Sequence, residues 1–540
     1  MHNMELEKIL FNYFGISEFR DKQKETIECL LNDQNTLCLM PTGMGKSLIY
    51  QVATIVKGKM TIIISPLIAL MEQQNVTLNK QLNQKNIYSI AFNSKNDSVI
   101  KQYKFLTDNF KPPYNPSFLF VSPEKMMLDG YIEYVLRQRR DEIGLIVVDE
   151  AHCVSQWGHS FRPAYKLIPK FLDDIFGSKK PPILCLTATI NENDKKEIIK
   201  DFKIDKVIQS ENLLRDNIDL HIEEQVSKNE EKNIRLKEIL NQFKGEKVIV
   251  FTHIKKREYG TKEMSKTYTN LGFNCAYFDS DLKDKEKDEV LENFTNGNVK
   301  IIFATNAFGM GIDISDIRCV VHYQIPENLE QYYQEVGRAG RDGKPSFAYL
   351  LHAEPNLRIK RDQIKKSSIT EKELLKNWEI ITNNKGLGFI GQWSNSDYSD
   401  DINPMVIFCK LIEKGYLKIL CKSIQKIDCF ENVKNNLQFK NYISIKKYVK
   451  LISDKTNEDI DKITTKIFDL VYQKEIALNS NPSKVLFYKV VKDLDGADLE
   501  NIINEFNIIK EYKLQGLEKL NEVLNKEISF DTALKKYLSI

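Results

Sequence analysis

The stretch Val147-Val148-Asp149-Glu150-Ala151-His152 decides the fold, because an apolar run ends abruptly in two adjacent carboxylates. The run from Ile143 to Val148 predicts a buried strand of a parallel sheet. In open parallel sheets, ligands bind beyond the carboxyl ends of the strands. Asp149 is therefore placed to hold a metal ion, directly or through water, and Glu150 to orient or deprotonate a water. An acidic strand end is often only a solvated end, so this interpretation requires a phosphate site nearby.

A phosphate-binding loop lies upstream, in Pro41-Thr42-Gly43-Met44-Gly45-Lys46-Ser47, between a predicted strand at Thr36 to Met40 and a helical run. Its glycines let the backbone wrap a phosphate, and the start of the helix attracts anions. Lys46 can reach the outer phosphates, and the Ser47 hydroxyl can ligate magnesium. Met40 occupies the position of the first glycine in GxxxxGK[ST]. A tight strand-to-helix turn would explain the glycines, but not a lysine and a serine directly after them.

The composition is typical of a soluble globular protein. The chain has 540 residues, 42% hydrophobic and 28% charged, which suggests roughly three domains. It has no apolar run of about 18 residues, and no signal peptide is visible after Met1, so no membrane association is expected. The nine cysteines form no CxxC pair, which favours reduced thiols, a cytoplasmic location and no zinc site of the usual spacing. A net charge of +3 is too small to identify a partner, so any nucleic-acid surface must be a local patch.

Two stretches of the chain alternate strand-like apolar runs with helical runs, which indicates two parallel α/β sheets. The first runs from Leu6 to about Ile208, and polar or turn residues follow each of its strands. Besides Thr36 to Met40, its predicted strands are Met60–Ser65, Phe118–Val121, Ile143–Asp149 and Ile183–Thr187. The second stretch begins after Leu213 and repeats no phosphate loop. Its predicted strands are Lys247–Thr252, Asn274–Phe278, Val299–Thr305, Cys319–Tyr323 and Phe347–Leu351.

The second stretch carries two other motifs, Gly309-Met310-Gly311-Ile312-Asp313 and the run QEVGRAGR from Gln334 to Arg341. Arg338 and Arg341, three residues apart beside glycines, would be an ordinary surface pair in isolation. Across from a phosphate loop, arginine is the residue type that stabilises charge developing on a transferred phosphoryl group. Two α/β lobes with one phosphate loop therefore indicate a motor protein whose nucleotide site lies between the lobes.

These motifs, in this order, resemble those of RecQ-family DNA helicases of superfamily 2, from about Leu10 to Leu351. The run CVSQWGHSFRP from Cys153 to Pro163 is the most diagnostic, because it resembles the aromatic-rich loop of this family. The superfamily needs no first glycine in its phosphate loop, so Met40 fits the resemblance. The other matching segments are Phe14-Gly15, Phe19-Arg20, Gln23, Ser65 to Leu70, Ser122-Pro123-Glu124, Asp149 to His152, Leu186 to Thr189 and Ala304 to Asp313.

The resemblance implies an α/β fold of two tandem RecA-like parallel-sheet lobes, at residues 1–208 and 209–354. A mainly helical C-terminal accessory region follows at 355–540. Met405 to Leu417 resembles a winged-helix helix running into its wing, so a winged helix is expected around 400–450. Helical periodicity dominates after that, and it indicates no function.

The C-terminal region departs from the family, which commonly continues into a zinc-binding subdomain. Cys409, Cys421 and Cys429 are too few and too widely spaced for that module, so no structural zinc is expected. Between Lys418 and Lys450, eight lysines face two acids, with aromatic residues among them. A charge run is more often a solvated face, but this basic stretch is the candidate for duplex contact.

The resemblance also implies ATP and Mg²⁺ as cofactors and assigns the residues of the site. Arg20 and Gln23 hold the adenine, Lys46 binds phosphate, Ser47 and Asp149 hold magnesium, and Glu150 activates water. The other catalytic and nucleotide-binding candidates are Thr42, Gly43, Met44, Gly45, His152, Gly311, Asp313, Gln334, Arg338 and Arg341. The DNA-binding candidates are Ser65, Pro66, Gln156, Trp157, His159, Phe161 and Arg162.

The loop from Gln156 to Arg162 has the chemistry of a single-strand contact. Trp157, His159 and Phe161 precede Arg162, and aromatic faces beside a cation suit stacking and backbone contact on single-stranded DNA. Aromatic side chains more often belong to a core. Here, the polar residues between the rings and the position directly after the acidic strand end favour the DNA interpretation.

Three positions depart from the family's usual residues. Ile16 stands where an aromatic ring usually packs on the adenine, which leaves base stacking largely to Arg20. Asp279 and Asp281 stand in a turn that usually contacts DNA, and two acids there put that contact in doubt. His253 replaces the more frequent cysteine or asparagine, a change treated as neutral.

The expected function is that of an ATP-dependent DNA helicase, with 3′-to-5′ polarity implied by the resemblance alone. Its expected partners are single-stranded DNA and forked or tailed duplex DNA, and no protein partner is assigned. A double-stranded-DNA translocase or remodeller would share every motif without separating strands. An RNA helicase shares the two lobes, although the Gln156–Arg162 loop argues against it. A non-catalytic scaffold is disfavoured because every catalytic position is filled.

Overall fold

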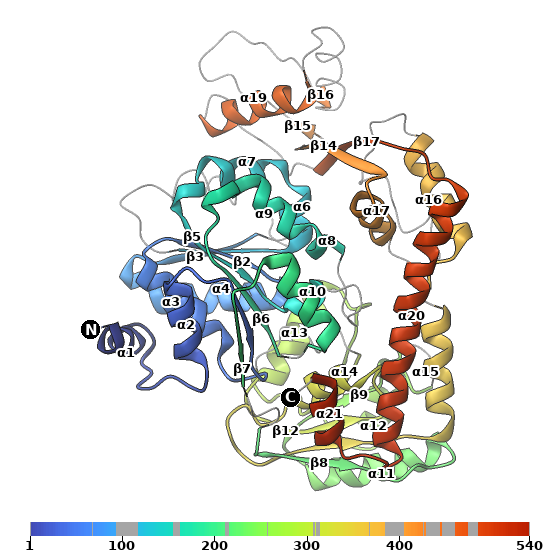
Figure 1. Ribbon diagram of the computed structural model, residues 1–540. Helices are drawn as coiled ribbons and strands as arrows, with labels where there is room; N and C mark the ends of the chain where they lie inside the picture. The colour runs from blue at the N-terminus through green and yellow to red at the C-terminus, as the bar shows by residue number, and fades with distance from the viewer. Residues whose placement is uncertain are drawn as a thin grey trace.

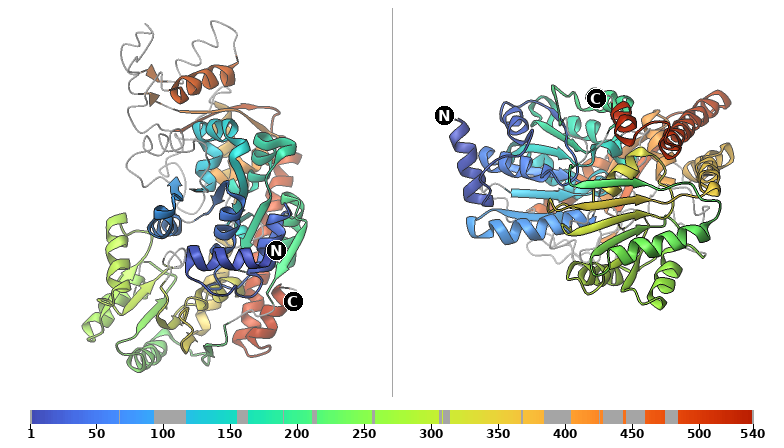
Figure 2. Two further views of the ribbon diagram at one scale, coloured as in Figure 1. Left: turned by 90° about the vertical axis from the view of Figure 1, so that its left-hand side faces the viewer. Right: turned by 90° about the horizontal axis from the view of Figure 1, so that it is seen from below.

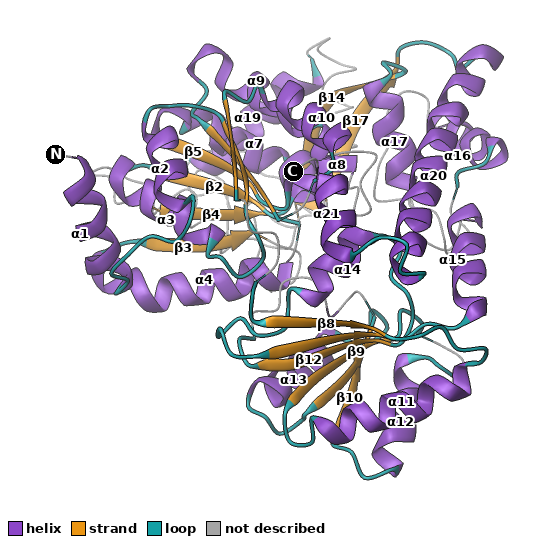
Figure 3. Ribbon diagram, turned by 60° about the horizontal axis from the view of Figure 1, so that its bottom comes forward, coloured by secondary structure: helices purple, strands orange, loops and turns teal. Residues whose placement is uncertain are grey.

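The structure is a computed structural model, in which two sheet-containing lobes are joined by a C-terminal region that contacts both (Figure 1). Figure 3 shows the two sheets as separate sets of strands with helices around them. Smaller two-stranded sheets pair β14 with β17 and β15 with β16. The residues described are 2–66, 68–92, 117–154, 163–188, 190–210, 215–255, 258–305, 308, 314–366, 368–383, 404–424, 426–427, 443–444, 459–473 and 484–538.

The first lobe contains a seven-stranded sheet with strand order β3-β4-β2-β5-β6-β1-β7, and every neighbouring pair is parallel. Its strands are β1 (Thr36–Leu39), β2 (Met60–Ile64), β3 (Tyr88–Phe92), β4 (Ser117–Val121), β5 (Ile143–Val148), β6 (Ile183–Thr187) and β7 (Lys206–Gln209). Its helices are α1 (His2–Phe14), α2 (Gln23–Leu31), α3 (Lys46–Lys57), α4 (Ile68–Leu82), α6 (Pro123–Leu128), α7 (Gly130–Gln138), α8 (Pro163–Lys166), α9 (Ile168–Phe176) and α10 (Glu192–Phe202). Short 3₁₀ turns lie at Asn83–Lys85, Arg140–Glu142, Ala151–Val154 and Gly177–Lys179.

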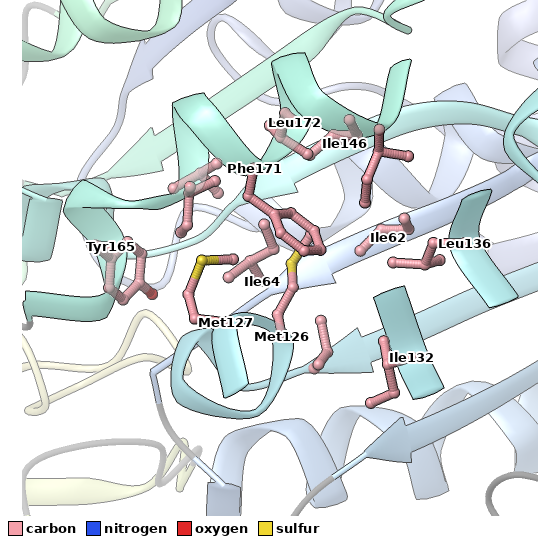
Figure 4. Packing of buried hydrophobic residues seen from close by; sticks show 14 of the residues in the cluster. Ile62, Ile64, Met126, Met127, Ile132, Leu136, Ile146, Tyr165, Phe171 and Leu172 are labelled. Atoms are coloured by element: carbon pink, nitrogen blue, oxygen red, sulfur yellow. The ribbon is translucent and has the colours of Figure 1, made fainter. Parts of the chain in front are cut away.

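Successive side chains of the central strands enter cores on opposite faces of this sheet. Ile62 and Ile64 of β2 pack with α6, α7 and α9, whereas Ile63 packs with α2 and α3 on the other face. Figure 4 shows Phe171 of α9 lying over Met126 and the strand residues of the first of these cores. Burial on both faces is why these strands read as continuous apolar runs in the sequence.

The second lobe contains a six-stranded sheet with strand order β10-β11-β9-β12-β13-β8, again with parallel neighbours. Its strands are β8 (Ile218–Ile222), β9 (Lys247–Phe251), β10 (Cys275–Phe278), β11 (Ile301–Ala304), β12 (Ile317–His322) and β13 (Ser346–Leu350). Its helices are α11 (Asn229–Gln242), α12 (Thr261–Asn270), α13 (Asp284–Thr295) and α14 (Leu329–Val336). The predicted parallel α/β sheets are therefore confirmed, although β3, β7 and β8 were not predicted.

The C-terminal region is mainly helical, as expected. Its elements are α15 (Glu354–Lys366), α16 (Glu371–Asn383), α17 (Pro404–Glu413), β14 (Leu417–Ile424), β15 (Lys426–Ile427), β16 (Ile443–Ser444), α19 (Ile460–Tyr472), β17 (Lys484–Val490), α20 (Gly496–Leu524) and α21 (Phe530–Leu538). The helix α17 runs through a turn at Gly415 into β14, which pairs antiparallel with β17. Most of the basic stretch from Lys418 to Lys450 lies outside the described residues. Its Lys422 forms an ion pair of 2.6 Å with Glu133 of α7 and is largely buried, which removes it from any duplex contact.

The C-terminal region completes the hydrophobic cores of both lobes. Ile463 and Phe468 of α19 join the core of the first lobe, where Phe468 packs on the ring of Tyr131. In the second lobe, α20 and α21 pack on α14 and β13, as Figures 1 and 2 show for the long α20 beside that lobe. The residues that α20 and α21 contribute there are Leu517, Leu520, Val523, Leu524, Phe530, Ala533 and Leu534. Among the helices that the structure describes, none combines the length and apolar character that a bilayer crossing requires.

Candidate nucleotide site between the lobes

The site lies at the carboxyl ends of β1, β6 and β5, three adjacent parallel strands of the first sheet. The phosphate loop follows β1, Thr187 ends β6, and Asp149 follows β5 directly. Parallel strands bring their carboxyl ends to one edge, so residues more than a hundred positions apart in the chain meet there. This confirms the predicted proximity of the loop and the acidic strand end.

A cavity of about 500 Å³ occupies this edge and reaches the second lobe. Gln334, Arg338 and Arg341 line it from the second lobe, opposite the phosphate loop. The other predicted site residues that line it are Arg20, Thr42, Gly43, Gly45, Lys46, Ser47, Pro66, Asp149, Glu150 and His152. Gly311, Asp313, Gln156, Trp157, His159, Phe161 and Arg162 lie outside the described residues.

Hydrogen bonds tie Arg20 and Gln23, the predicted adenine contacts, to the phosphate loop. Gln23 Nε2 donates to the carbonyls of Met44 and Gly45, at 3.0 Å each, and Gln23 Oε1 accepts from the backbone N–H of Arg20 at 2.8 Å. Arg20 Nη1 donates to the carbonyl of Gly43 at 2.9 Å. Gly45 has φ +78°, and a Cβ there would lie 2.8 Å from Gln23 Nε2. The left-handed backbone conformation therefore favours glycine at position 45, and a side chain there would also displace the Gln23 amide from the loop.

Lys46 and Ser47 begin α3 and face the cavity. Lys46 Nζ donates to the carbonyl of Met40 at 3.1 Å. Burial lowers the pKa of Lys46, and the nearby carboxylates of Glu150 and Asp149 oppose that shift. Ser47 Oγ accepts a hydrogen bond of 3.0 Å from Gln74 Nε2, a residue of α4 that sequence reasoning missed. No local motif marks Gln74, because only the fold brings α4 against the start of α3.

Asp149 is held by several hydrogen bonds at the end of β5. Its Oδ1 accepts from the backbone N–H of Glu150 at 3.0 Å, and its Oδ2 accepts from the Ser65 hydroxyl at 3.2 Å. The Tyr165 hydroxyl donates to its backbone carbonyl at 2.9 Å. Burial and the adjacent Glu150 raise the pKa of Asp149 to about 7, against the opposing charge of Lys46. A buried carboxylate of this kind is stabilised by a cation, which is the property of a magnesium ligand.

Glu150 and His152 follow Asp149 in the chain and also line the cavity. Glu150 has φ +49°, a left-handed conformation that is uncommon outside glycine and often marks a functional turn. His152, which is buried, lies in the 3₁₀ turn that follows. Its Nδ1 is 3.0 Å from Thr187 Oγ1 and 3.3 Å from Glu150 Oε2. His152 therefore links the acidic turn to the end of β6.

Gln334 of α14 faces the cavity, together with Arg338 and Arg341 of the turn that follows the helix. Burial, with a contribution from Arg341, lowers the pKa of Arg338 to about 10, while Glu335 and Glu150 act in the opposite direction. Glu335 is buried and accepts hydrogen bonds from Gln331 Nε2 at 2.9 Å and from His322 Nε2 at 2.8 Å. His253 stands where the family more often has cysteine or asparagine, and its Nε2 lies 3.3 Å from the same carboxylate. These contacts fix α14 on the ends of β9 and β12.

Two residues, Ser65 and Arg215, have contacts at the nucleotide site that the sequence did not predict. Ser65, expected to contact DNA, is fully buried and donates to Asp149. Arg215, which follows the connection between the lobes and was not singled out, donates to backbone carbonyls of both the phosphate loop and the QEVGRAGR segment. Its sequence surroundings contain no glycine pattern or acidic pair, so only the fold reveals it.

Two family models match the chain. The DEAD/DEAH box helicase model matches residues 20–198, and the Helicase conserved C-terminal domain model matches residues 231–343. The first range contains the phosphate loop and the acidic strand end, and the second contains the cavity-lining segment of α14 and its following turn. Each match therefore covers one lobe and its half of the site.

The chain is similar to several helicases. It is 32% identical over 371 residues to a probable ATP-dependent DNA helicase RecS of Bacillus subtilis, covering 68% of this chain and 71% of that protein. The ATP-dependent DNA helicase RecQ of the same species is 35% identical over 376 residues, with coverage of 68% and 59%. A putative ATP-dependent RNA helicase of Acanthamoeba polyphaga mimivirus is 34% identical over 360 residues, with coverage of 66% and 62%. The chain thus spans less than two thirds of the length of the last two.

Solved helicase structures share the fold at low sequence identity. Mycobacterium smegmatis helicase Lhr, bound to single-stranded DNA and AMP-PNP, matches with a TM-score of 0.52 and 15% identity, over 70% of this chain and 50% of that one. Saccharomyces cerevisiae Dbp5, bound to RNA and ADP BeF3, matches with a TM-score of 0.51 and 18% identity, over 67% and 90%. At these identities the likeness shows two RecA-like helicase lobes and nothing about substrate.

Proposed function

The chain belongs to the RecQ family of ATP-dependent DNA helicases, and on that premise we propose that it couples ATP hydrolysis to 3′-to-5′ movement along single-stranded DNA and to duplex unwinding. One observation carries the proposal. A single cavity holds the phosphate loop, the acidic strand end and Arg338 and Arg341 from the opposite lobe. A site divided in this way can be assembled and taken apart by movement of the lobes, which is what a translocating motor requires.

The chemistry follows from the side chains that face the cavity. Lys46 Nζ neutralises the outer phosphates, and Glu150 accepts the proton of the attacking water. Arg338 and Arg341 stabilise the charge on the transferred phosphoryl group. Ser47 and Asp149 would hold Mg²⁺, which supplies further neutralisation of phosphate charge when bound. Arg20 and Gln23 hold the adenine beside the loop to which they are hydrogen-bonded.

Coupling to DNA follows from the position of the Gln156–Arg162 loop in the chain. His152 and Cys153 line the cavity, and the loop begins within a few residues of them. We assign Trp157 and Phe161 to base stacking and Arg162 to the DNA backbone. Single-stranded DNA held there would act on Glu150 through the turn that carries His152. Forked or tailed duplex DNA is the proposed substrate for unwinding.

The site does not depend on a structural zinc in this proposal. Within the described part of the chain, three potential metal ligands come together at His253, His322 and Glu335. Because Glu335 already accepts hydrogen bonds from His322 and Gln331, we interpret the group as a hydrogen-bonded cluster. EDTA should stop turnover, and added Mg²⁺ should restore it fully. Metal analysis that finds about one zinc per purified chain would contradict this interpretation, and substitution of His253 would then test the cluster as its site.

The second candidate function is that of an RNA helicase, because a relative of similar identity carries that name. A duplex-DNA translocase without strand separation remains the third. One set of assays separates them: ATPase activity with single-stranded DNA, duplex DNA and RNA, measured beside displacement of 3′-tailed, 5′-tailed and forked DNA strands. We expect stimulation by single-stranded DNA and displacement from 3′-tailed or forked duplexes.

The control is Lys46→Ala, which should abolish hydrolysis and displacement while single-stranded DNA still binds. Lys57→Ala, at the other end of α3 and paired with Asp33, should behave as the wild type. Stimulation by RNA alone would favour the second candidate. Stimulation by duplex DNA without displacement would favour the third.

A further inference from the structure

We propose that Arg215 is a positioning residue that sets the distance between the phosphate loop of the first lobe and the arginine-bearing turn of the second. The inference rests on the proposed function, since it concerns how the two lobes are held around the same cavity. It assigns a role to a residue outside every motif that the sequence revealed.

The hydrogen bonds of Arg215 join segments from both lobes. Its Nη1 donates to the carbonyl of Thr42 at 2.7 Å. Its Nη2 donates to the carbonyl of Gly337 at 3.0 Å and to that of Ala339. One planar guanidinium therefore bridges the phosphate loop and the turn that follows α14, from Gly337 to Ala339, which carries Arg338. A lysine ammonium, as a single point donor, could not span both groups of carbonyls in this way.

Arg215 packs closely against the phosphate loop, at a point where two glycines leave room for side chains. A Cβ at Gly43 would lie 2.5 Å from Arg215 Nη1, so the guanidinium rests directly on the phosphate loop. A Cβ at Gly337 would lie 2.3 Å from Thr42 Oγ1, which itself donates to the Gly337 carbonyl at 3.2 Å. The two glycines thus permit the backbones of opposite lobes to approach, and Arg215 fixes that approach.

The electrostatics around Arg215 favour a polyanion in the cavity. Burial and the neighbouring Arg341 lower the pKa of Arg215 to about 10, which leaves it charged near neutral pH. The pKa of Arg338 is lowered to the same value, again with Arg341 as a cause. The three acceptors of Arg215 are neutral carbonyl oxygens. Arg341 repels both of the other guanidinium groups, and a phosphate chain in the cavity that Arg338 and Arg341 line would relieve this repulsion.

Loss of Arg215 should affect nucleotide binding and ATP turnover to different degrees. Lys46, Ser47 and the loop backbone bind nucleotide from the first lobe alone. Arg338 and Arg341 act on the transferred phosphoryl group only when their turn is held against the loop. Loss of Arg215 should therefore spare nucleotide affinity and reduce kcat, because an interaction needed for closure is not needed for binding.

The test compares Arg215→Gln and Arg215→Lys with Arg235→Gln, which alters a partly exposed arginine of the same lobe that pairs with Glu223 and Glu238. Thermal unfolding first establishes that each variant is folded. Affinity is then measured with AMP-PNP and Mg²⁺, and kcat with saturating ATP and single-stranded DNA. We expect Arg215→Gln to bind AMP-PNP within about threefold of the wild type and to lose about 10- to 100-fold in kcat. Arg215→Lys should recover little of that loss, and Arg235→Gln should match the wild type.

Several outcomes would overturn the inference. Wild-type kcat in Arg215→Gln would show that the bridge is dispensable. Equal losses of affinity and kcat would make Arg215 a local part of the phosphate loop. Full recovery in Arg215→Lys would mean that charge alone suffices. A wild-type protein without DNA-stimulated ATPase would instead refute the proposed function and this inference together, so the two failures are distinguishable.

Discussion

The Ser65 hydroxyl donates to Oδ2 of Asp149 across 3.2 Å, joining the ends of the neighbouring strands β2 and β5. Ser65 is the first residue of the segment Ser65 to Leu70, which contains the predicted DNA contacts Ser65 and Pro66. Asp149 is the proposed magnesium ligand. If the residues after Ser65 contact DNA as proposed, this hydrogen bond would connect DNA binding to the nucleotide site. A shift of this segment when DNA binds would lengthen or break the hydrogen bond to Asp149 in the nucleotide site.

Ser65→Ala should weaken magnesium use without unfolding the protein. Asp149 keeps its bond from the Glu150 backbone but loses a buried donor, an effect of about 1–3 kcal/mol. We expect a higher half-saturating Mg²⁺ concentration and a several-fold lower kcat in steady-state assays. Ser89→Ala is the matched control, because Ser89 is also buried but lies on the edge strand β3, bonded to Asn75. Unchanged magnesium dependence would show that Ser65 has no part in the metal site.

Glu150→Gln should bind ATP but turn it over more slowly by orders of magnitude. Asp149 and the phosphate loop remain intact, so affinity is preserved while the proton acceptor is lost. Nucleotide binding and single-turnover hydrolysis measured on one preparation would separate the two effects. A variant that cannot bind ATP would indicate that Glu150, with its φ of +49°, serves mainly to shape the turn.

Trp157→Ala and Phe161→Ala should leave basal ATPase nearly unchanged and remove most of its stimulation by DNA. Base–aromatic stacking is worth about 1–3 kcal/mol per base, enough to uncouple strand engagement from hydrolysis. Titration of ATPase activity with single-stranded DNA provides the measurement. If either variant unfolds instead, its ring belongs to the core and the DNA assignment is wrong.

Acidification should destabilise the second lobe through His322. Burial lowers the pKa of His322 below its ordinary 6.5, although Glu335 opposes the shift. The unfolded chain therefore takes up this proton first, and stability falls as pH drops below about 6.5. The pKa of Glu335 is lowered because His253, His322 and their hydrogen bonds outweigh its burial, so its contribution is lost only at more acidic pH. His322→Gln should show a smaller decline in Tm than the wild type between pH 7.5 and 5.5, and equal declines would contradict this account.

Phe530→Ala should destabilise the second lobe although it lies far from the motifs in sequence. Phe530 is buried, and its ring meets that of Tyr332 of α14 edge-on, with centroids 5.0 Å apart. A buried phenylalanine replaced by alanine costs about 3–5 kcal/mol. Thermal unfolding should detect the loss, whereas Ile508→Ala, on the exposed side of α20, should change Tm little. Equal effects of the two substitutions would show that α21 adds nothing specific to the lobe.

The parts of the fold that sequence predicted are those buried on both sides. Strands such as β5 are continuous apolar runs because helices cover both faces of the sheet. The missed strands β3, β7 and β8 lie at the edges of the two sheets, where, among the described strands, each has a neighbour on one side only. Ile218–Ile222 alternates apolar with polar residues, and Ser89 interrupts the short run Tyr88–Phe92, so the strand signal of both is weak.

The candidate site likewise contains some residues that the sequence predicts and others that only the fold reveals. Lys46 and Asp149 were predictable because each belongs to a short local pattern whose chemistry can be read from adjacent residues. Gln74 and Arg215 were not, since their roles come from hydrogen bonds to segments 27 and 173 residues away. Ser65 was placed on the DNA side because its motif suggested it, while the parallel pairing of β2 with β5 brings it to Asp149.

The packing of α20 and α21 on the second lobe also imposes an order in time during protein synthesis. Strand β13 ends at Leu350, but its apolar neighbours on one face, from Leu514 to Leu534, follow more than 160 residues later. At about 5–20 residues per second, a ribosome needs roughly 10–40 s to supply them. During that interval Tyr332 and Leu350 lack the part of their core that α20 and α21 contribute. Newly made protein should therefore be most prone to aggregation, and most dependent on chaperones, at this late stage of translation.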